Sequence, residues 1–183
     1  SDNNIYQKAL SYGKCDKGLT QEGYFLDLKT FLLHNSLFKS NIQIIEKEIR
    51  LQIERVLKCG IYPSFINSHY YLSELPFIKN LELKLAIEYG IKTTRIPRQG
   101  FINNTQLPIN FGMTKTYLFQ SIINGLVSIN KVRNRSLLKQ LITNDYFYGV
   151  MNTFRMNKII LIDIIKNLKC GVTEILFHPA LEN

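Results

Sequence analysis

Two histidines stand at or near the ends of segments that the sequence marks as short β-strands. His69 follows the run 64–67, and His178 follows the run 173–177 and precedes Pro179. In sheets of parallel strands, polar side chains just beyond the strand ends are where metals and substrates usually bind. A single imidazole at such a place also has a purely structural interpretation, as a side chain that is held by the strand end. Both interpretations stay open for both residues.

Arg95 and Glu174 are charged residues inside apolar, strand-like runs. Because buried charges need partners, the two side chains belong to an interior ion pair or network, or Arg95 contacts a substrate. Tyr71 lies two positions after His69, and its ring could stack on a sugar or simply belong to the core. These residues and the two histidines are the candidates for a functional site.

Helical and strand-like segments alternate along the chain. Apolar residues at helical spacing, glycines as end signals and Pro76 as a first-turn residue predict the helices. We expect helices at 42–60, 76–90, 114–128, 131–142 and 157–169, and strands at 64–67, 91–96 and 173–177. The segment 145–151 is a strand or a loop, with Gly149 as a tight point. This alternation predicts an α/β fold with a mainly parallel sheet, built as a single domain over residues 1–183.

The net charge of +9 comes from 23 Lys and Arg residues against 14 Asp and Glu residues. The positive residues are spread along the chain, which favours a solvated surface over a nucleic-acid interface. The densest basic stretch, at 131–139, alternates with apolar residues such as Val132 at helical spacing. This pattern predicts the wet face of an amphipathic helix. We therefore expect no nucleic-acid partner.

The hydrophobic share of 45% and the charged share of 20% are typical of a soluble globular protein. No apolar run reaches the roughly 18 residues that a membrane-spanning helix needs, so we expect no membrane span. Since the N-terminus has no apolar signal core, we expect a cytoplasmic location. Cys59 and Cys170 each precede a glycine at a predicted helix end, and we expect both to be small buried residues.

Five segments resemble the YdjC family of carbohydrate deacetylases, and they occur in the family's order. They are EGYF at 22–25, EIRLQIERVLKCG at 48–60, PSFINSHYYLSELP at 63–76, LAIEYGIKTTRIP at 85–97 and GVTEILFHPA at 171–180. The stretch DYFYGVMNTFRM at 145–156 is most similar to the hopanoid-biosynthesis branch of that family. Together these segments extend over most of the chain.

This resemblance implies an incomplete TIM-like (β/α) barrel with a mainly parallel sheet and one divalent metal, zinc or magnesium. The family removes N-acetyl groups from amino sugars or glycolipids, and its metal polarises the acetamide carbonyl and activates a water molecule. By position, His69 corresponds to a metal ligand and His178 to the general acid. Arg95 and Tyr71 are the substrate contacts that we expect.

The sequence departs from the family's pattern where the metal binds. The family's D-x-H-x-H-x-H motif reads from Asn67 to Ser73 in this chain, and His69 is its only remaining histidine. The residues before the EGYF segment contain neither the family's aspartate pair nor its second metal histidine. We therefore expect a partial domain that lacks early strands and the C-terminal end, and this puts its catalytic activity in question.

Three hypotheses about function follow from these observations. The first is a metal-dependent deacetylase domain whose missing ligands come from another chain or segment. The second is a non-catalytic pseudoenzyme that binds a glycan or a protein. The third, suggested by charge alone and placed behind the others, is a nucleic-acid-binding module. A sheet that lacks early strands leaves edges unpaired, so we also expect self-association into a homo-oligomer.

Overall fold

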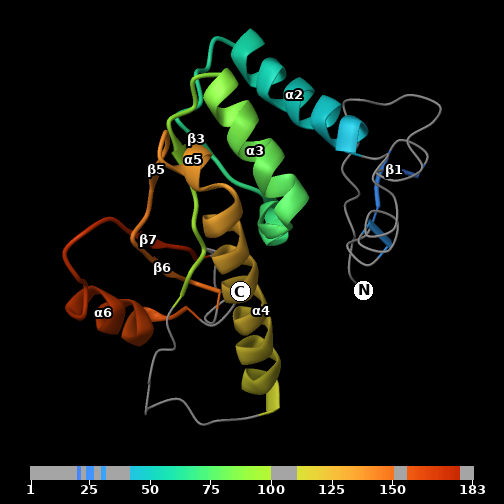
Figure 1. The fold of residues 1–183 in the computed structure, drawn as a ribbon. Coiled ribbons are helices and arrows are strands. Elements are labelled where there is room, and N and C mark those ends of the chain that lie inside the picture. The colour runs from blue at the N-terminus through green and yellow to red at the C-terminus, as the bar shows by residue number, and fades with distance from the viewer. Residues whose placement is uncertain are drawn as a thin grey trace. The chain divides into compact units, whose positions relative to one another are not determined.

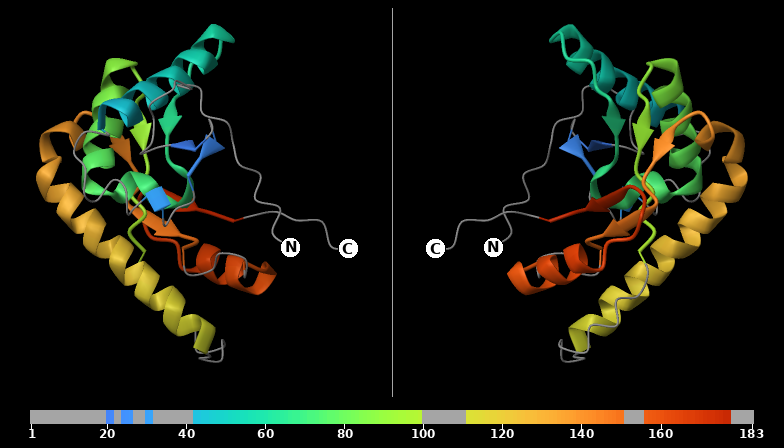
Figure 2. Two further views of the ribbon diagram at one scale, coloured as in Figure 1. Left: turned by 90° about the vertical axis from the view of Figure 1, so that its right-hand side faces the viewer. Right: turned by 90° about the vertical axis from the view of Figure 1, so that its left-hand side faces the viewer.

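The structure of the chain is a computed structural model. It describes residues 20–21, 24–26, 30–31, 42–99, 111–150 and 156–177. The chain forms two compact units, Ser1–Pro63 and Ser64–Asn183. Their elements are shown in Figures 1 and 2. No helix among the described residues is long and apolar enough to cross a membrane.

The first unit contains a short antiparallel strand pair and one long helix. Its described elements are β1 (Thr20–Gln21), β2 (Tyr24–Phe25) and α2 (Ile42–Lys58). The helix forms where the sequence predicts it, because Ile45 and Ile53 recur at helical spacing and are buried on one face. Gly60 follows its end with a φ of 75°, a conformation that glycine adopts without steric cost.

The second unit alternates strands and helices, as the sequence predicts. Its described elements are β3 (Phe65–Ile66), the 3₁₀-helix η2 (His69–Glu74), α3 (Pro76–Glu88), β4 (Thr93–Thr94), α4 (Phe111–Arg133), α5 (Arg135–Leu138), β5 (Ile142–Thr143), β6 (Tyr146–Tyr148), α6 (Lys158–Lys166) and β7 (Thr173–Ile175). β4 lies between β3 and β5, and both pairs are parallel; β6 and β7 form a separate parallel pair. This confirms the mixed α/β fold. The described strands do not close into a barrel.

α3 is the central helix of this unit. Pro76 occupies its first turn, where a missing backbone N–H costs no intrahelical hydrogen bond, and Gly90 follows its end with a φ of 70°. Both signals were predicted from the sequence. The helix contacts η2, β4, α4 and α5, and its Leu83, Leu85 and Ala86 side chains are fully buried. The core of the unit therefore surrounds α3.

Two helices form in the stretch where 114–128 and 131–142 were predicted, but both pairs of bounds are wrong. α4 continues without interruption to Arg133, and α5 is only a four-residue turn of helix. The helix continues because Asn130 is buried and donates from Nδ2 to the Glu74 carbonyl oxygen at 2.9 Å. The break comes at Asn134, whose Oδ1 accepts from Asn80 Nδ2 at 2.8 Å. Both polar side chains anchor the end of α4 to neighbouring elements.

The end of the chain also refines the predicted boundaries. α6 ends at Lys166, three residues before the predicted end at 169. Gly149, predicted as a tight point within the segment 145–151, has a φ of 138°, and a Cβ atom there would lie 2.5 Å from the Leu176 carbonyl oxygen. The burial predicted for two cysteines is wrong, because Cys59 and Cys170 are both exposed. Each lies in the turn beyond its helix rather than on the packed face.

Candidate functional site

The segment after β3 has an unusual backbone. Tyr70 and Tyr71 have φ angles of 52° and 56°, so two consecutive bulky residues adopt the left-handed conformation. Such residues cost about 1–3 kcal/mol each unless the surroundings hold them. One contact that stabilises this turn is a hydrogen bond, which the Ser73 N–H donates to Ser68 Oγ at 2.7 Å. The turn leaves Tyr70 exposed and directs Tyr71 toward the core.

The Tyr71 ring packs on the core cluster of Ile96, Ile123 and Val127. It also meets Phe147 edge-on, at 6.3 Å between ring centroids. Its hydroxyl is buried and has no hydrogen-bond partner among the described residues. Burial raises the pKa of the phenol to about 12, although the nearby Arg95 charge opposes the shift. The hydroxyl therefore stays protonated and is an unused donor.

Arg95 and Glu174 form an ion pair, which is one of the two uses that the sequence leaves open for these charges. Arg95 Nε donates to Glu174 Oε1 at 2.7 Å, and Nη2 contacts the same oxygen. The amide oxygen of Asn67, when it faces the guanidinium, accepts from Nη2 at 3.0 Å and from Nη1 at 3.2 Å. The guanidinium also lies 5.3 Å from the Phe147 ring centre. Since Arg95 follows β4 and Glu174 is in β7, the pair joins the two parallel sheets.

Within the described part of the chain, His69 belongs to no cluster of acidic, histidine or cysteine side chains. It is exposed, and its ring lies 4.2 Å from the Tyr70 ring in an edge-on arrangement. Among the described residues, no group of three or more His, Cys, Asp or Glu side chains could hold a metal ion. A catalytic zinc site uses three protein ligands. The described residues around His69 therefore do not fit such a metal, and His178 lies outside the described part of the chain.

Asn67 stands where the family motif begins with an acidic residue. An amide cannot supply the negative charge that a carboxylate gives to a metal site. In this structure the Asn67 side chain faces the Arg95 guanidinium instead. The structure thus brings Arg95 and Tyr71 together around Phe147, and it uses Asn67 to hold Arg95. It does not bring His69 together with further metal ligands among the described residues.

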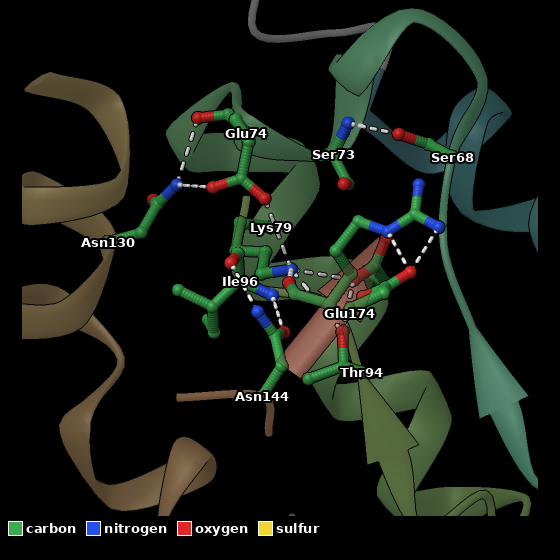
Figure 3. A network of polar contacts seen from close by, with 11 residues as sticks. Ser68, Ser73, Glu74, Lys79, Thr94, Ile96, Asn130, Asn144 and Glu174 are labelled. Atoms are coloured by element: carbon green, nitrogen blue, oxygen red, sulfur yellow. Dashed lines mark hydrogen bonds and ion pairs between the residues drawn. The ribbon is translucent and has the colours of Figure 1, made fainter. Parts of the chain in front are cut away.

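Sequence reasoning missed a buried ionic network directly behind this site (Figure 3). The Lys79 side chain is fully buried, and its Nζ lies 2.9 Å from Glu82 Oε1 and 3.4 Å from Glu74 Oε1. Lys79 also donates to Thr94 Oγ1 at 3.3 Å and to the Arg95 carbonyl oxygen at 3.0 Å. The network thus fixes the backbone of the residue that pairs with Glu174.

The electrostatics of this network are dominated by burial. Burial raises the pKa of the Glu74 carboxyl group, and the Lys79 charge and a hydrogen bond from Asn130 partly oppose the shift. A sequence signal for the network existed, because Lys79 and Glu82 are three residues apart. They also share the helical face of the apolar residues that follow. Charged residues on a helix are normally assigned to solvent, and this assignment hides the network.

On the other side of the site, the Asn144 side chain bonds to the backbone of Ile96, in the way that a neighbouring strand would. Its Oδ1 accepts from the Ile96 N–H at 2.8 Å, and its Nδ2 donates to the Ile96 carbonyl oxygen at 2.9 Å. The same Nδ2 reaches the Tyr146 carbonyl oxygen at 3.0 Å. This one side chain therefore holds the segment that follows Arg95 against the start of β6.

A comparison with protein families gives one match. A family model described as YdjC-like protein matches residues 7–183, nearly the whole chain. No curated protein and no solved structure matches the chain. The matched range includes all of the described residues that form the site around Arg95 and Tyr71.

Proposed function

This chain belongs to the YdjC-like family, and we propose that it is a carbohydrate deacetylase-type domain that recognises an N-acetylated amino sugar or glycolipid. At the family level, membership points to a carbohydrate deacetylase-type function. The glycolipid alternative rests on the likeness of residues 145–156 to the hopanoid-biosynthesis branch. The architecture that we propose for the domain is an incomplete TIM-like barrel, supported by its parallel strand pairs.

The observation that carries the proposal is the arrangement of Arg95 and Tyr71 around Phe147. The two residues lie in different family-like segments and are more than twenty positions apart in the sequence, and both contact the Phe147 ring. The Tyr71 hydroxyl is buried beside this pair and has no partner among the described residues. The neighbouring residue, Tyr70, is exposed, and its ring provides an apolar face of the kind on which sugar rings stack.

Hydrolysis is the part of the proposal that needs more than the described residues. In the family, the chemistry rests on a divalent metal, and His69 is the one matching ligand in the described segment. We propose that any hydrolysis by this chain depends on metal ligands outside the described residues, with His178 as the general acid. The ion pair of Arg95 with Glu174 supports a positioning role for the arginine, since its Nε and Nη2 already share a carboxylate oxygen.

A second candidate function is glycan or protein binding without catalysis. It is favoured by the structural uses of three residues in the degenerate metal motif. Asn67 faces Arg95, the Tyr71 ring packs in the core, and the Ser73 backbone is held by a serine hydroxyl. These contacts give the three residues a role in stabilising the fold, and that role does not require a bound metal.

Calorimetric titration of the chain with chito-oligosaccharides tests the recognition of N-acetylated sugars. We expect binding that Arg95→Ala weakens at least tenfold, because the variant removes the group that holds Glu174 and borders Tyr71. Arg98→Ala is the matched control, since Arg98 is exposed and close in sequence. If the chain binds no N-acetylated sugar or glycolipid headgroup, or if both variants bind as the wild type does, the proposal is wrong.

Metal titration and acetate release separate the two candidate functions. A deacetylase should take up zinc or magnesium stoichiometrically, lose affinity for it in His69→Ala, and release acetate from chito-oligosaccharides. A non-catalytic domain should bind the sugar without metal and release no acetate. Sugar binding with neither metal uptake nor acetate release would therefore decide for the second candidate.

A further inference from the structure

The Arg95 guanidinium lies beside two aromatic rings. Its central carbon is 5.8 Å from the Phe65 ring centre and 5.3 Å from the Phe147 ring centre. Aromatic faces attract a cation but do not replace the hydrogen bonds that its N–H groups need, so polar partners must approach at its edges. Among the described residues these partners are Glu174 and Asn67. Very few side chains therefore decide the charge of this group.

The charges around the guanidinium cancel. Arg95 carries one positive charge and Glu174 one negative charge, and the two are joined through Nε and Nη2. Asn67 contributes only an uncharged amide oxygen, which accepts from Nη2 at 3.0 Å and from Nη1 at 3.2 Å when it faces the guanidinium. The neighbouring Tyr71 stays neutral, because burial raises its pKa to about 12. These four side chains together carry no net charge.

This balance matters because the ion pair is partly shielded from water. The side chains of Arg95 and Glu174 are 13% and 23% exposed. Charges in such a place interact more strongly than charges on an open surface, since the effective dielectric constant is lower than that of water. A charge that a ligand brings here must find a counter-charge or lose hydration without replacement. The Asn67 amide supplies no counter-charge.

The buried ionic network behind Arg95 is compensated within itself. Thr94 Oγ1 bonds to Lys79 and Glu82, and adjacent residues of an extended chain point to opposite sides, so this network lies on the face of β4 away from the Arg95 side chain. Lys79 Nζ pairs with both carboxylates, at 2.9 Å and 3.4 Å. Burial also raises the pKa of Glu74, which reduces the negative charge of the network. Its side chains are buried and belong to the core.

Asn67 lies on the accessible side of the ion pair. It directly follows β3 and is exposed, and Phe65, two positions earlier, is 39% exposed. Both side chains contact the Arg95 guanidinium. Phe147, by contrast, is buried. A ligand that approaches the ion pair from the solvent therefore meets Asn67 and Phe65 first.

We propose that Asn67 determines the charge specificity of this site, which selects an uncharged sugar unit. The inference rests on the proposed function and narrows its ligand. An N-acetylated amino sugar is neutral, whereas the same sugar without its acetyl group carries an ammonium group, and a uronic acid carries a carboxylate. An ammonium group would approach Arg95 where the nearby carboxylate of Glu174 is already paired, and a carboxylate would approach Glu174 itself. Penalties on the wrong ligand of this kind produce specificity.

The same neutrality separates the substrate of a deacetylation from its product. Hydrolysis adds water across the acetamide C–N bond and yields acetate and an amine, which takes up a proton. The sugar therefore changes from neutral to positively charged in the reaction. A site without net negative charge holds the charged sugar less tightly than the neutral one, because the ammonium group gives up hydration without gaining a counter-charge. Asn67 thus favours release of the deacetylated sugar.

A series of charge variants tests the proposal. Asn67→Asp gives the group one net negative charge, and Glu174→Gln gives it one net positive charge. Calorimetry measures the affinity of each protein for N-acetylated chito-oligosaccharides, their fully deacetylated forms and uronic acid oligosaccharides of the same length. We expect the wild type to prefer the N-acetylated form. Asn67→Asp should raise the affinity ratio of deacetylated to N-acetylated sugar by roughly fivefold or more, and Glu174→Gln should raise the ratio of acidic to N-acetylated sugar by a similar factor.

Two controls separate the local charge from other effects. Ser64→Asp adds the same charge at an exposed position about 10 Å back along the strand, and screening at physiological ionic strength should leave the ratios unchanged. Asn67→Ser removes the amide but keeps the group neutral, so it should retain the wild-type preference. Because each ratio compares ligands on one protein, a loss of stability that weakens all of them equally cancels.

The outcomes distinguish this inference from the proposed function. If the wild type prefers N-acetylated sugar and Asn67→Asp shifts the ratio no more than Ser64→Asp does, the inference is overturned and sugar recognition stands. A wild-type chain that binds the deacetylated or the acidic sugar as tightly as the N-acetylated one overturns it as well. A chain that binds none of the three ligands contradicts the proposed function, and the inference is lost with it.

Discussion

Replacing the buried Lys79 by methionine gives the sharpest test of the energetics inferred for the second unit. Methionine keeps much of the volume of the side chain but removes its charge. The change leaves the Glu82 carboxylate without its ion pair at 2.9 Å and the Glu74 carboxylate without its nearest cation at 3.4 Å. It also removes the donor to the Arg95 carbonyl oxygen. Two acidic groups would then be buried side by side.

Removing one partner of a buried ion pair costs about 3–5 kcal/mol, because the remaining charge is left uncompensated. The lost hydrogen bond to the backbone overlaps with this cost, and Thr94 Oγ1 still donates to Glu82 Oε1 at 2.9 Å. We therefore expect Lys79→Met to lower the free energy of unfolding by about 4 kcal/mol at pH 8. With a urea dependence of about 2 kcal/mol/M, the unfolding midpoint should fall by about 2 M.

The loss should depend on pH in a defined direction. The pKa of Glu74 is raised in the folded protein, so its protonated form is favoured there. A raised pKa contributes stability that is present at low pH and is lost as the pH rises through the folded pKa. Lys79 lowers this pKa, and its removal must raise it further. The stability difference between the wild type and Lys79→Met should therefore shrink as the pH falls from 8 toward 5.

Two further variants make the test specific. Lys84→Met changes an exposed lysine of the same helix and should alter stability by no more than about 0.5 kcal/mol. Adding Glu74→Gln and Glu82→Gln to Lys79→Met removes both orphaned charges and should recover more than half of the loss, since a neutral network avoids the desolvation cost. Urea unfolding followed by circular dichroism measures all four proteins. A loss below about 1 kcal/mol, or one that does not change with pH, would refute the reasoning.

Four other variants test local features of the structure by thermal or urea unfolding. Gly149→Ala should lose about 3 kcal/mol or more, because its φ is positive and a carbonyl oxygen occupies the Cβ position. Gly125→Ala, in a helix with open space, should gain about 0.5–1 kcal/mol, and similar effects at both glycines would contradict the geometry. Asn144→Asp should cost about 2–3 kcal/mol, since a carboxylate cannot donate to the Ile96 carbonyl oxygen; an unchanged midpoint would rule out that bridge. Tyr71→Phe should change stability by less than about 1 kcal/mol, because the lost hydroxyl is unpartnered among the described residues. An ultraviolet titration of this variant should lack one phenol that ionises at about pH 12.

Much of the framework of the second unit could be predicted from residue types and spacing. Pro76 and Gly90 marked the ends of α3, and both signals act through the local backbone alone. The parallel pairing followed from strands that alternate with helices. The pairing of Arg95 with Glu174 was one of two predicted uses of these charges, and the structure shows it. The metal interpretation of His69 and the role of His178 stay predictions.

Other features depended on how the chain folds back on itself. Arg95 and Glu174 are 79 residues apart, so their contact depends on the placement of β4 against β7 and not on any local pattern. The burial of Lys79 likewise depends on acidic and backbone partners from η2, α3 and the segment after β4. A solvation cost of this kind is acceptable only when tertiary packing supplies those partners.

The sequence by itself determined the family, the ends of α3 and the departure of the motif at Asn67 to Ser73 from a metal-binding pattern. Tertiary structure alone decided which side of α4 is covered. The covered side of α4 combines the apolar Ile123 and Val127 with the polar Gln120 and Asn130, and the ordinary rule assigns such polar side chains to water. In this protein, Asn130 is buried because its Nδ2 can donate to the Glu74 carbonyl oxygen, a partner that only the folded chain supplies.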